Sequence, residues 1–200
     1  MASINYALKE ISCKIVYYGP GMCGKTTNLQ FIHQHITEDR KGKMVSLATP
    51  GERTLFFDFL PLEAPSIHGF DTKFQVYTVP GQVMYNSTRR LVLRGVDGVI
   101  FVCDSQWEKM RENVESFHNM EDNLASYNCS LDTIPYVVQY NKRDLGNVAP
   151  VRFLDWLINH RQVPSYEASA VEGAGVFETL NHACRLVLSN LRSKQQRGAL

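Results

Sequence analysis

The chain has 200 residues, of which 21 are basic and 20 acidic, so its formal net charge is +1 at pH 7. This near-neutral balance gives no electrostatic support for a nucleic-acid-binding protein or for one held on an anionic membrane surface. Hydrophobic residues make up 44% of the sequence, which is enough for the core of one α/β domain. We therefore expect a single domain over residues 1–200. The five cysteines are odd in number and lack metal-ligand spacing, which favours free thiols in a reducing compartment.

Membrane attachment is not indicated by any segment of the sequence. The longest apolar run, residues 99–103, is far too short to span a bilayer. The second residue is Ala2, where myristoylation needs glycine, and residues 195–200 contain no cysteine box. These features predict a cytoplasmic protein without a membrane anchor.

The first motif along the chain follows a predicted strand over residues 11–18, which is rich in β-branched and aromatic residues. It reads Gly19-Pro20-Gly21-Met22-Cys23-Gly24-Lys25-Thr26, the G-x-x-x-x-G-K-[ST] spacing of a phosphate-binding loop. Thr27 then opens a predicted helix over residues 27–32. Glycines let the backbone approach an anion, loop amides and the helix N-terminus attract it, Lys25 adds a charge, and the Thr26 hydroxyl suits Mg²⁺. An ordinary glycine turn before a helix is the alternative interpretation.

The rest of the chain alternates between strand and helix patterns. Strands are expected over residues 44–48, 55–60, 70–79, 98–104, 134–140 and 165–168, and helices over residues 85–93, 104–127, 151–159 and 176–191. Residues 61–68 are expected to form a wide connection. This order predicts an α/β fold with one doubly wound sheet, helices on both faces, and nucleotide loops at the carboxyl ends of the strands.

A second motif, Asn141-Lys142-Arg143-Asp144, follows the strand that ends at residue 140 and has the pattern N-K-x-D. A carboxylate such as Asp144 can accept hydrogen bonds from N1 and the 2-amino group of guanine, whereas adenine offers no donors in that arrangement. Asn141 can hold the loop, and the Lys142 stem can cover the face of the base. After the last predicted strand, Ser169-Ala170 can present a backbone amide to the guanine oxygen. A plain polar turn is the alternative for this tetrapeptide.

With these motifs, and with Pro80-Gly81-Gln82, the chain resembles the Ras-like small GTPases over almost its whole length. A narrower resemblance, to the MglA family of bacterial polarity and gliding-motility GTPases, rests on residues 5–6, 13–21, 53–62 and 77–82. The resemblance implies a P-loop NTPase fold, a Ras-like three-layer sandwich with a mostly parallel central sheet. It also implies that GTP/GDP and Mg²⁺ bind, and that the chain is a slow GTP hydrolase that sits at a cell pole in the GTP state.

The partners implied by the same resemblance are proteins rather than nucleic acids. They are an MglB-like roadblock-domain homodimer acting as the GTPase-activating protein, and effectors of polarity, gliding or type IV pili. The chain alone is expected to be a monomer.

Catalytic and switch roles also follow from the resemblance. Lys25 and Mg²⁺ would neutralise phosphate oxygens, and Gln82 would orient the attacking water. Thr54 would close over Mg²⁺ and, with the Gly81 amide, sense the γ-phosphate. Arg53 would act as an arginine finger supplied in cis. For Arg53 the alternative is an exposed loop arginine, and Thr49 is a rival for the Thr54 role.

One position departs from the wider superfamily, because the usual D-x-x-G reads Thr78-Val79-Pro80-Gly81 here. Thr78 could replace the missing magnesium-associated aspartate weakly, and the carboxylates nearest in the chain are Asp58 and Asp104. Asp104 is expected to cap a helix N-terminus, and Asp58 is at least equally well explained as a solvated strand residue. The missing aspartate keeps open a GTP-binding scaffold with negligible hydrolysis. A P-loop kinase or ATPase is the other rival, against which N-K-x-D argues.

Overall fold

The computed structural model describes residues 3–46, 58–67 and 69–196. Strands in these residues are β1 (Ser3–Asn5), β2 (Glu10–Tyr18), β3 (Val45–Ser46), β4 (Asp58–Ile67), β5 (Phe70–Thr78), β6 (Gly98–Asp104), β7 (Tyr136–Asn141) and β8 (Ser165–Glu167). Helices are α1 (Lys25–His35), α2 (Asn86–Leu93), α3 (Met110–Ala125), α4 (Val151–Ile158) and α5 (Val176–Gln196).

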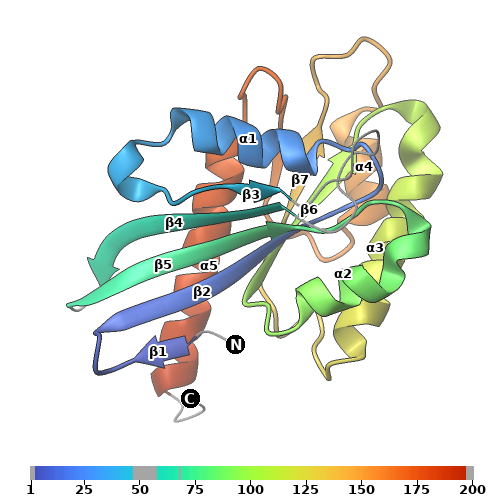
Figure 1. The fold of residues 1–200 in the computed structure, drawn as a ribbon. Coiled ribbons are helices and arrows are strands. Elements are labelled where there is room, and N and C mark those ends of the chain that lie inside the picture. Colours follow the sequence, from blue (N-terminus) through green and yellow to red (C-terminus); the bar gives the residue numbers. More distant parts are fainter. Residues whose placement is uncertain (1–2, 47–57, 68, 197–200) are drawn as a thin grey trace.

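All the described strands belong to one sheet in the order β3-β4-β5-β2-β6-β7-β8, with β1 paired to β2 (Figure 1). Strands β5, β2, β6, β7 and β8 are parallel, whereas β4, β3 and β1 each run antiparallel to their neighbours. The expected mostly parallel sheet is therefore confirmed. Its strand order changes direction beside β2, so the loop that follows β2 lies at the switch point where α/β sheets bind ligands.

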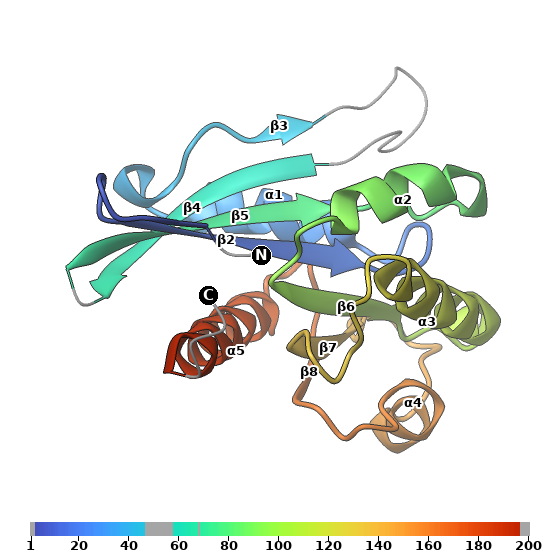
Figure 2. The same ribbon diagram turned by 90° about the horizontal axis from the view of Figure 1, so that it is seen from below.

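Two apolar clusters, one on each face of the sheet, produce the three layers. Alternate residues of β2 serve both: Ile15 packs with Leu29 of α1 and Leu180 of α5, whereas Val16 packs in the cluster that contains α2, α3 and α4. Figure 2 shows α5 separated from α2 and α3 by the strands. A strand buried on both faces has a nearly continuous apolar sequence, as residues 98–103 have.

Two sequence predictions about elements are wrong. The expected wide connection over residues 61–68 is instead the larger part of β4, which forms a hairpin with β5. Proline lacks a backbone N–H and cannot donate to a neighbouring strand. Pro61 is tolerated because β3 pairs with β4 only at residues 58–59, so no continuous row of backbone hydrogen bonds is required along the outer side of β4. The helix expected from residue 104 begins at Met110, after a 3₁₀ helix over Trp107–Lys109.

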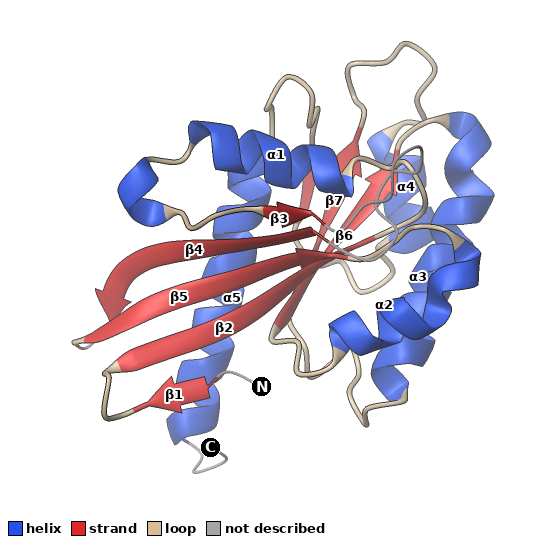
Figure 3. Cartoon of the chain, in the orientation of Figure 1, coloured by secondary structure: helices blue, strands red, loops and turns tan. Residues whose placement is uncertain are grey.

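Loops at the carboxyl ends of β2, β6 and β7 gather at one end of the sheet, beside the N-terminus of α1 (Figure 3). This follows from topology, because parallel strands all end on the same side. The motifs that lie far apart in the sequence are thus brought to one place.

Candidate functional site

The glycine-rich loop over residues 19–24 joins β2 to α1, and its backbone requires glycine at two positions. Gly19 has φ 148° and Gly24 has φ 100°, a region that other residues rarely adopt. A Cβ at Gly19 would lie 2.2 Å from the carbonyl oxygen of Val102, and one at Gly24 would lie 2.2 Å from Nδ2 of Asn141. The loop is therefore folded tightly between β6 and the N-K-x-D loop, with no space for side chains at either glycine.

Lys25 is the charged residue of this loop, and its side chain is 6% exposed. Its Nζ donates hydrogen bonds of 2.9 Å to the carbonyl oxygen of Gly19 and 2.6 Å to that of Pro20. The ammonium group is thus held over the loop by carbonyl groups. This arrangement places a positive charge where the sequence predicted a phosphate chain.

Asn141 connects the glycine-rich loop with the segment after β8. Its Nδ2 donates to the carbonyl oxygen of Cys23 at 2.7 Å, and its Oδ1 accepts from the backbone amide of Ala170 at 2.9 Å. The expected loop-holding role of Asn141 is present in the geometry. The Ala170 amide, expected to face a guanine oxygen, is bonded to Asn141 here, and Ser169 is buried beside it.

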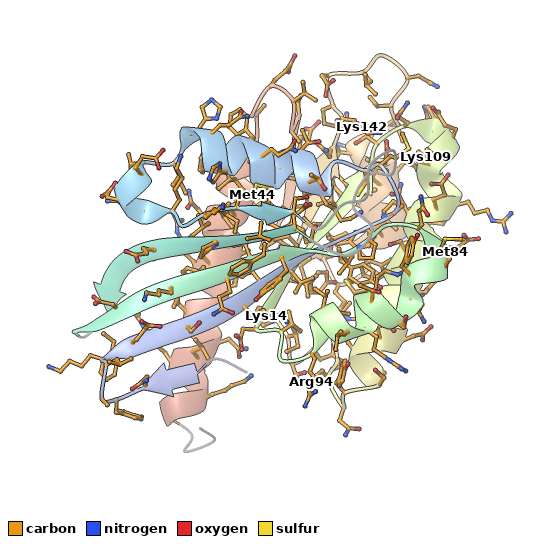
Figure 4. The ribbon with its side chains drawn as sticks, viewed as in Figure 1. Lys14, Met44, Met84, Arg94, Lys109 and Lys142 are labelled. Carbon is orange, nitrogen blue, oxygen red and sulfur yellow. The ribbon has the colours of Figure 1, made fainter. Side chains whose placement is uncertain are left out.

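Within the N-K-x-D loop, Lys142 is held by neighbouring side chains, whereas Asp144 is exposed. Lys142 has φ 67°, and its Nζ lies 2.6 Å from Oδ2 of the buried Asp104 and 3.1 Å from Oε1 of Gln106. Asp104 is therefore an anchor for Lys142 and not the cap of α3. Asp144 is exposed, which leaves its carboxylate accessible to a ligand. Figure 4 shows Lys142 in the loop region near Lys109.

The Pro80-Gly81-Gln82 segment lies against the glycine-rich loop. A Cβ at Gly81 would lie 2.4 Å from the Cα of Gly21 and 2.6 Å from the carbonyl oxygen of Pro20, so only glycine fits there. Gln82 is exposed and directly precedes the 3₁₀ helix Val83–Tyr85. The backbone of Gly81 is thus close to the loop that contains Lys25.

A buried carboxylate also belongs to this site, and its burial excludes one of the two interpretations that the sequence left open, a solvated strand residue. Asp58 is fully buried rather than solvated, and its Oδ2 accepts hydrogen bonds from Thr26 Oγ1 at 2.6 Å and from Thr78 Oγ1 at 2.9 Å. Two sequence signals point toward it, the absence of aspartate at position 78 and an acidic residue inside an apolar run, but neither shows which groups it contacts. Arg53, Thr54 and Thr49 lie outside the described residues.

Cys23 is a buried residue of the loop, and Cys103 is buried in the adjoining strand β6. Burial raises the pKa of the Cys23 thiol and raises that of Cys103 well above its ordinary value. Both thiols are therefore protonated near neutral pH and unsuited to act as nucleophiles.

The site fits a nucleotide with Mg²⁺ better than a metal held by protein side chains alone. A glycine cradle, a buried ammonium, and a threonine hydroxyl beside a buried carboxylate lie together. Among the described residues, no group of three His, Cys, Asp or Glu side chains could hold a metal ion. In the same residues, no helix combines the length and apolar character required to cross a membrane.

Comparisons with known proteins agree with this geometry. The sequence model of the Ras family matches residues 14–189. The mutual gliding-motility protein MglA of Myxococcus xanthus is 55% identical over 192 residues, covering 96% of this chain and 98% of that protein. The Ras-related protein Rab7 of Drosophila melanogaster is 26% identical, covering 84% of this chain and 76% of that protein. The Ypt/Rab-type GTPase ypt7 of Schizosaccharomyces pombe is 24% identical, covering 92% of this chain and 86% of that protein.

Proposed function

Because the chain belongs to the Ras family of small GTPases, we propose that this GTP hydrolase and molecular switch controls cell polarity and motility through partners that recognise its GTP state. Residues 1–200 would act as one G domain. GTP and GDP, with Mg²⁺, would be its ligands.

The observation that carries the proposal is the position of Asn141. Its side chain makes hydrogen bonds both to the glycine-rich loop, at Cys23, and to the segment after β8, at Ala170. The two halves of a guanine nucleotide site are thereby held in one fixed relation before a ligand arrives, which lowers the entropic cost of binding.

Base recognition would fall to the N-K-x-D loop. Asp144, exposed at the loop, would accept two hydrogen bonds from guanine, and Lys142, held by Asp104, would cover the ring with its stem. Ser169 and Ala170 would complete the pocket. ATP would leave the Asp144 carboxylate without donors, which is the physical reason to expect selection against adenine.

Phosphate binding would fall to the backbone of the glycine-rich loop. The residues concerned are Gly19, Pro20, Gly21, Met22, Cys23, Gly24, Lys25, Thr26 and Thr27. Lys25 would offset negative charge on the phosphates, and the Gly81 amide would sense the terminal phosphate.

Hydrolysis would depend on positioning and on charge. Thr26 and Thr54 would hold Mg²⁺, which when bound offsets negative charge on the phosphate oxygens. Gln82 would orient water, and Arg53 would supply a guanidinium in cis. The roles of Arg53 and Thr54 rest on the resemblance to the MglA family, since both lie outside the described residues.

The biological assignment follows the 55% identical relative, whose name is that of a gliding-motility protein. We propose that gliding or type IV pili are the controlled machinery and that an MglB-like roadblock-domain homodimer activates hydrolysis. Recruitment to a cell pole in the GTP state is part of the same proposal.

The test is hydrolysis of GTP and of ATP by the purified chain with Mg²⁺, each with and without a roadblock-domain dimer. We expect the chain to hydrolyse GTP and not ATP. Hydrolysis of GTP should be slow without the roadblock-domain dimer and faster with it. Equal turnover of ATP would contradict the guanine assignment. If the dimer leaves GTP turnover unchanged, the partner assignment is contradicted, but the assignment of the chain as a GTP hydrolase still stands.

A further inference from the structure

Asp58 is the first residue of β4 in the described structure, and its carboxylate is surrounded by hydroxyl groups. Thr26 Oγ1 and Thr78 Oγ1 both donate to Oδ2, at 2.6 Å and 2.9 Å, and Ser46 Oγ donates to Oδ1 at 2.5 Å. The backbone amide of Asp58 in turn donates to Thr78 Oγ1 at 2.8 Å. Two hydrogen bonds therefore hold Asp58 to Thr78.

The register of the antiparallel strands explains this arrangement. Phe59 of β4 is paired with Tyr77 of β5, so Asp58 stands beside Thr78 on the neighbouring strand. Asp58 is also paired with Ser46 of β3. Side chains opposite each other on adjacent strands share a face and lie close together. A carboxylate from β4 thus reaches the space beside the end of β5, where the usual D-x-x-G motif would place its aspartate.

The cluster contains a buried acid with no buried base. Asp58 and Thr78 are both fully buried, and among the described residues the partners of the Asp58 carboxylate are the hydroxyl groups of Thr26, Ser46 and Thr78. A buried carboxylate is costly unless it is paired or coordinates a metal, and hydroxyl groups supply hydrogen bonds but no charge. The arrangement is therefore suited to a cation beside Thr26.

We propose that Asp58 supplies the carboxylate of the magnesium site in this chain, acting through the Thr26 hydroxyl, and that Thr78 holds Asp58 in place. This inference rests on the proposed function, since it assumes a nucleotide with Mg²⁺ at the glycine-rich loop. A threonine hydroxyl carries one proton and two lone pairs, so Thr26 can give a lone pair to the metal while donating its proton to Asp58. Magnesium in nucleotide sites is typically held by one or two carboxylates together with phosphates.

The experiment measures nucleotide release rather than activity. A fluorescent GDP analogue is loaded onto the protein and chased with excess unlabelled GDP over a series of free Mg²⁺ concentrations. In the wild type we expect release to slow as Mg²⁺ rises. Asp58→Asn removes the carboxylate at nearly constant volume, and the Mg²⁺ concentration for half-maximal slowing should rise about 10–100-fold.

The matched control is Glu63→Gln, which removes the same charge from an exposed position on the same strand. It should keep the wild-type Mg²⁺ dependence within about threefold, which is well below the 10–100-fold change expected at Asp58. If the Asp58→Asn curve coincides with the Glu63→Gln curve, the inference is overturned. Circular dichroism during thermal unfolding shows whether each variant is folded.

A second variant decides the matter if Asp58→Asn is unstable. The exchange Asp58→Thr with Thr78→Asp keeps the same atoms in the cluster but moves the carboxylate to the end of β5. Recovery of Mg²⁺-dependent release in this variant supports the inference, and its loss overturns it. A wild type that binds no guanine nucleotide would instead contradict the proposed function, so the two failures are distinguishable.

Discussion

The side-chain amide of Asn141 donates a 2.7 Å hydrogen bond to the carbonyl oxygen of Cys23. This bond joins two loops whose bonded residues are 118 positions apart in the sequence. The same side chain fills the space in which Gly24 would carry a Cβ. The glycine at 24 and the asparagine at 141 are thus two parts of one contact, and replacing either should disturb the other.

Asn141→Ala should lower the free energy of unfolding by about 2–4 kcal/mol, because it leaves a buried carbonyl at Cys23 and a buried amide at Ala170 without partners. The measurement is urea denaturation without nucleotide. GTP affinity should also fall, because the two loops lose their fixed relation. A change in stability below about 0.5 kcal/mol would show that water replaces Asn141 at little cost.

Gly81→Ala should weaken binding of a non-hydrolysable GTP analogue more than binding of GDP. A Cβ there would meet the backbone of Gly21 at 2.4 Å, so the two segments must separate. Gly146→Ala is the matched control, since nothing lies within 4 Å of its Cβ position. Calorimetry with both ligands checks this, and equal losses for GDP and the analogue would argue against a sensing role for Gly81.

Asp144→Asn should reduce GTP affinity about 10–100-fold, because hydrogen bonds to a charged group contribute about 1.5–3 kcal/mol. ITP, which lacks the 2-amino group of guanine, tests the assigned contact directly. The wild type should prefer GTP to ITP, and the variant should show a smaller preference. If the preference is unchanged by the substitution, Asp144 does not contact the 2-amino group.

Much of the fold was predictable because its signals are local. The apolar run over residues 98–103 predicted a central strand, and β6 covers it. By contrast β1 was missed, because three residues carry no recognisable period and its pairing with β2 depends on tertiary contact. The sequence predicts a connection over residues 61–68, whereas residues 61–67 belong to β4, an incompletely paired strand that tolerates their prolines.

For the candidate site, the motifs identified which loops meet but not which side chains bond. Asn141, Lys142 and Lys25 were found from spacing, and the structure brings their loops together. Asp58 could not be assigned, because its partners Thr26 and Thr78 are 32 and 20 residues away in sequence. Only the cross-strand register shows that its carboxylate reaches the loop. The roles of Arg53 and Thr54 remain predictions.

Gln82→Leu and Arg53→Ala should each retain GTP affinity within about threefold and lose partner-stimulated turnover, by about 10²-fold or more for Gln82 and 10³-fold for Arg53. Both groups are assigned to the transition state rather than to ground-state binding. Single-turnover hydrolysis with the roadblock-domain dimer measures the loss. Arg192→Ala, at an exposed position of α5, is the control. Wild-type stimulated turnover in either variant would remove that residue from the mechanism.

Stability should fall as the pH rises above about 9, because burial raises the pKa of two thiols: Cys13 on β2, the strand that leads into the loop, and Cys184 on α5. Burial, with a smaller contribution from Asp97, raises the pKa of Cys13 to about 12, and burial raises that of Cys184 to about 12. The folded state therefore keeps these protons after the unfolded chain has lost them. The stability is fully present below the unfolded pKa near 9 and is lost as the pH rises toward 12.

Each such thiol should contribute a slope of about 1.4 kcal/mol per pH unit well above pH 9. Urea denaturation between pH 7 and 10, with reductant and constant GDP and Mg²⁺, measures the total slope. Cys13→Ala removes one thiol and should make the slope shallower by up to that amount, while leaving the slope below pH 8 unchanged. An identical slope in this variant would mean that other groups, such as Tyr18, whose pKa burial also raises to about 12, account for the loss.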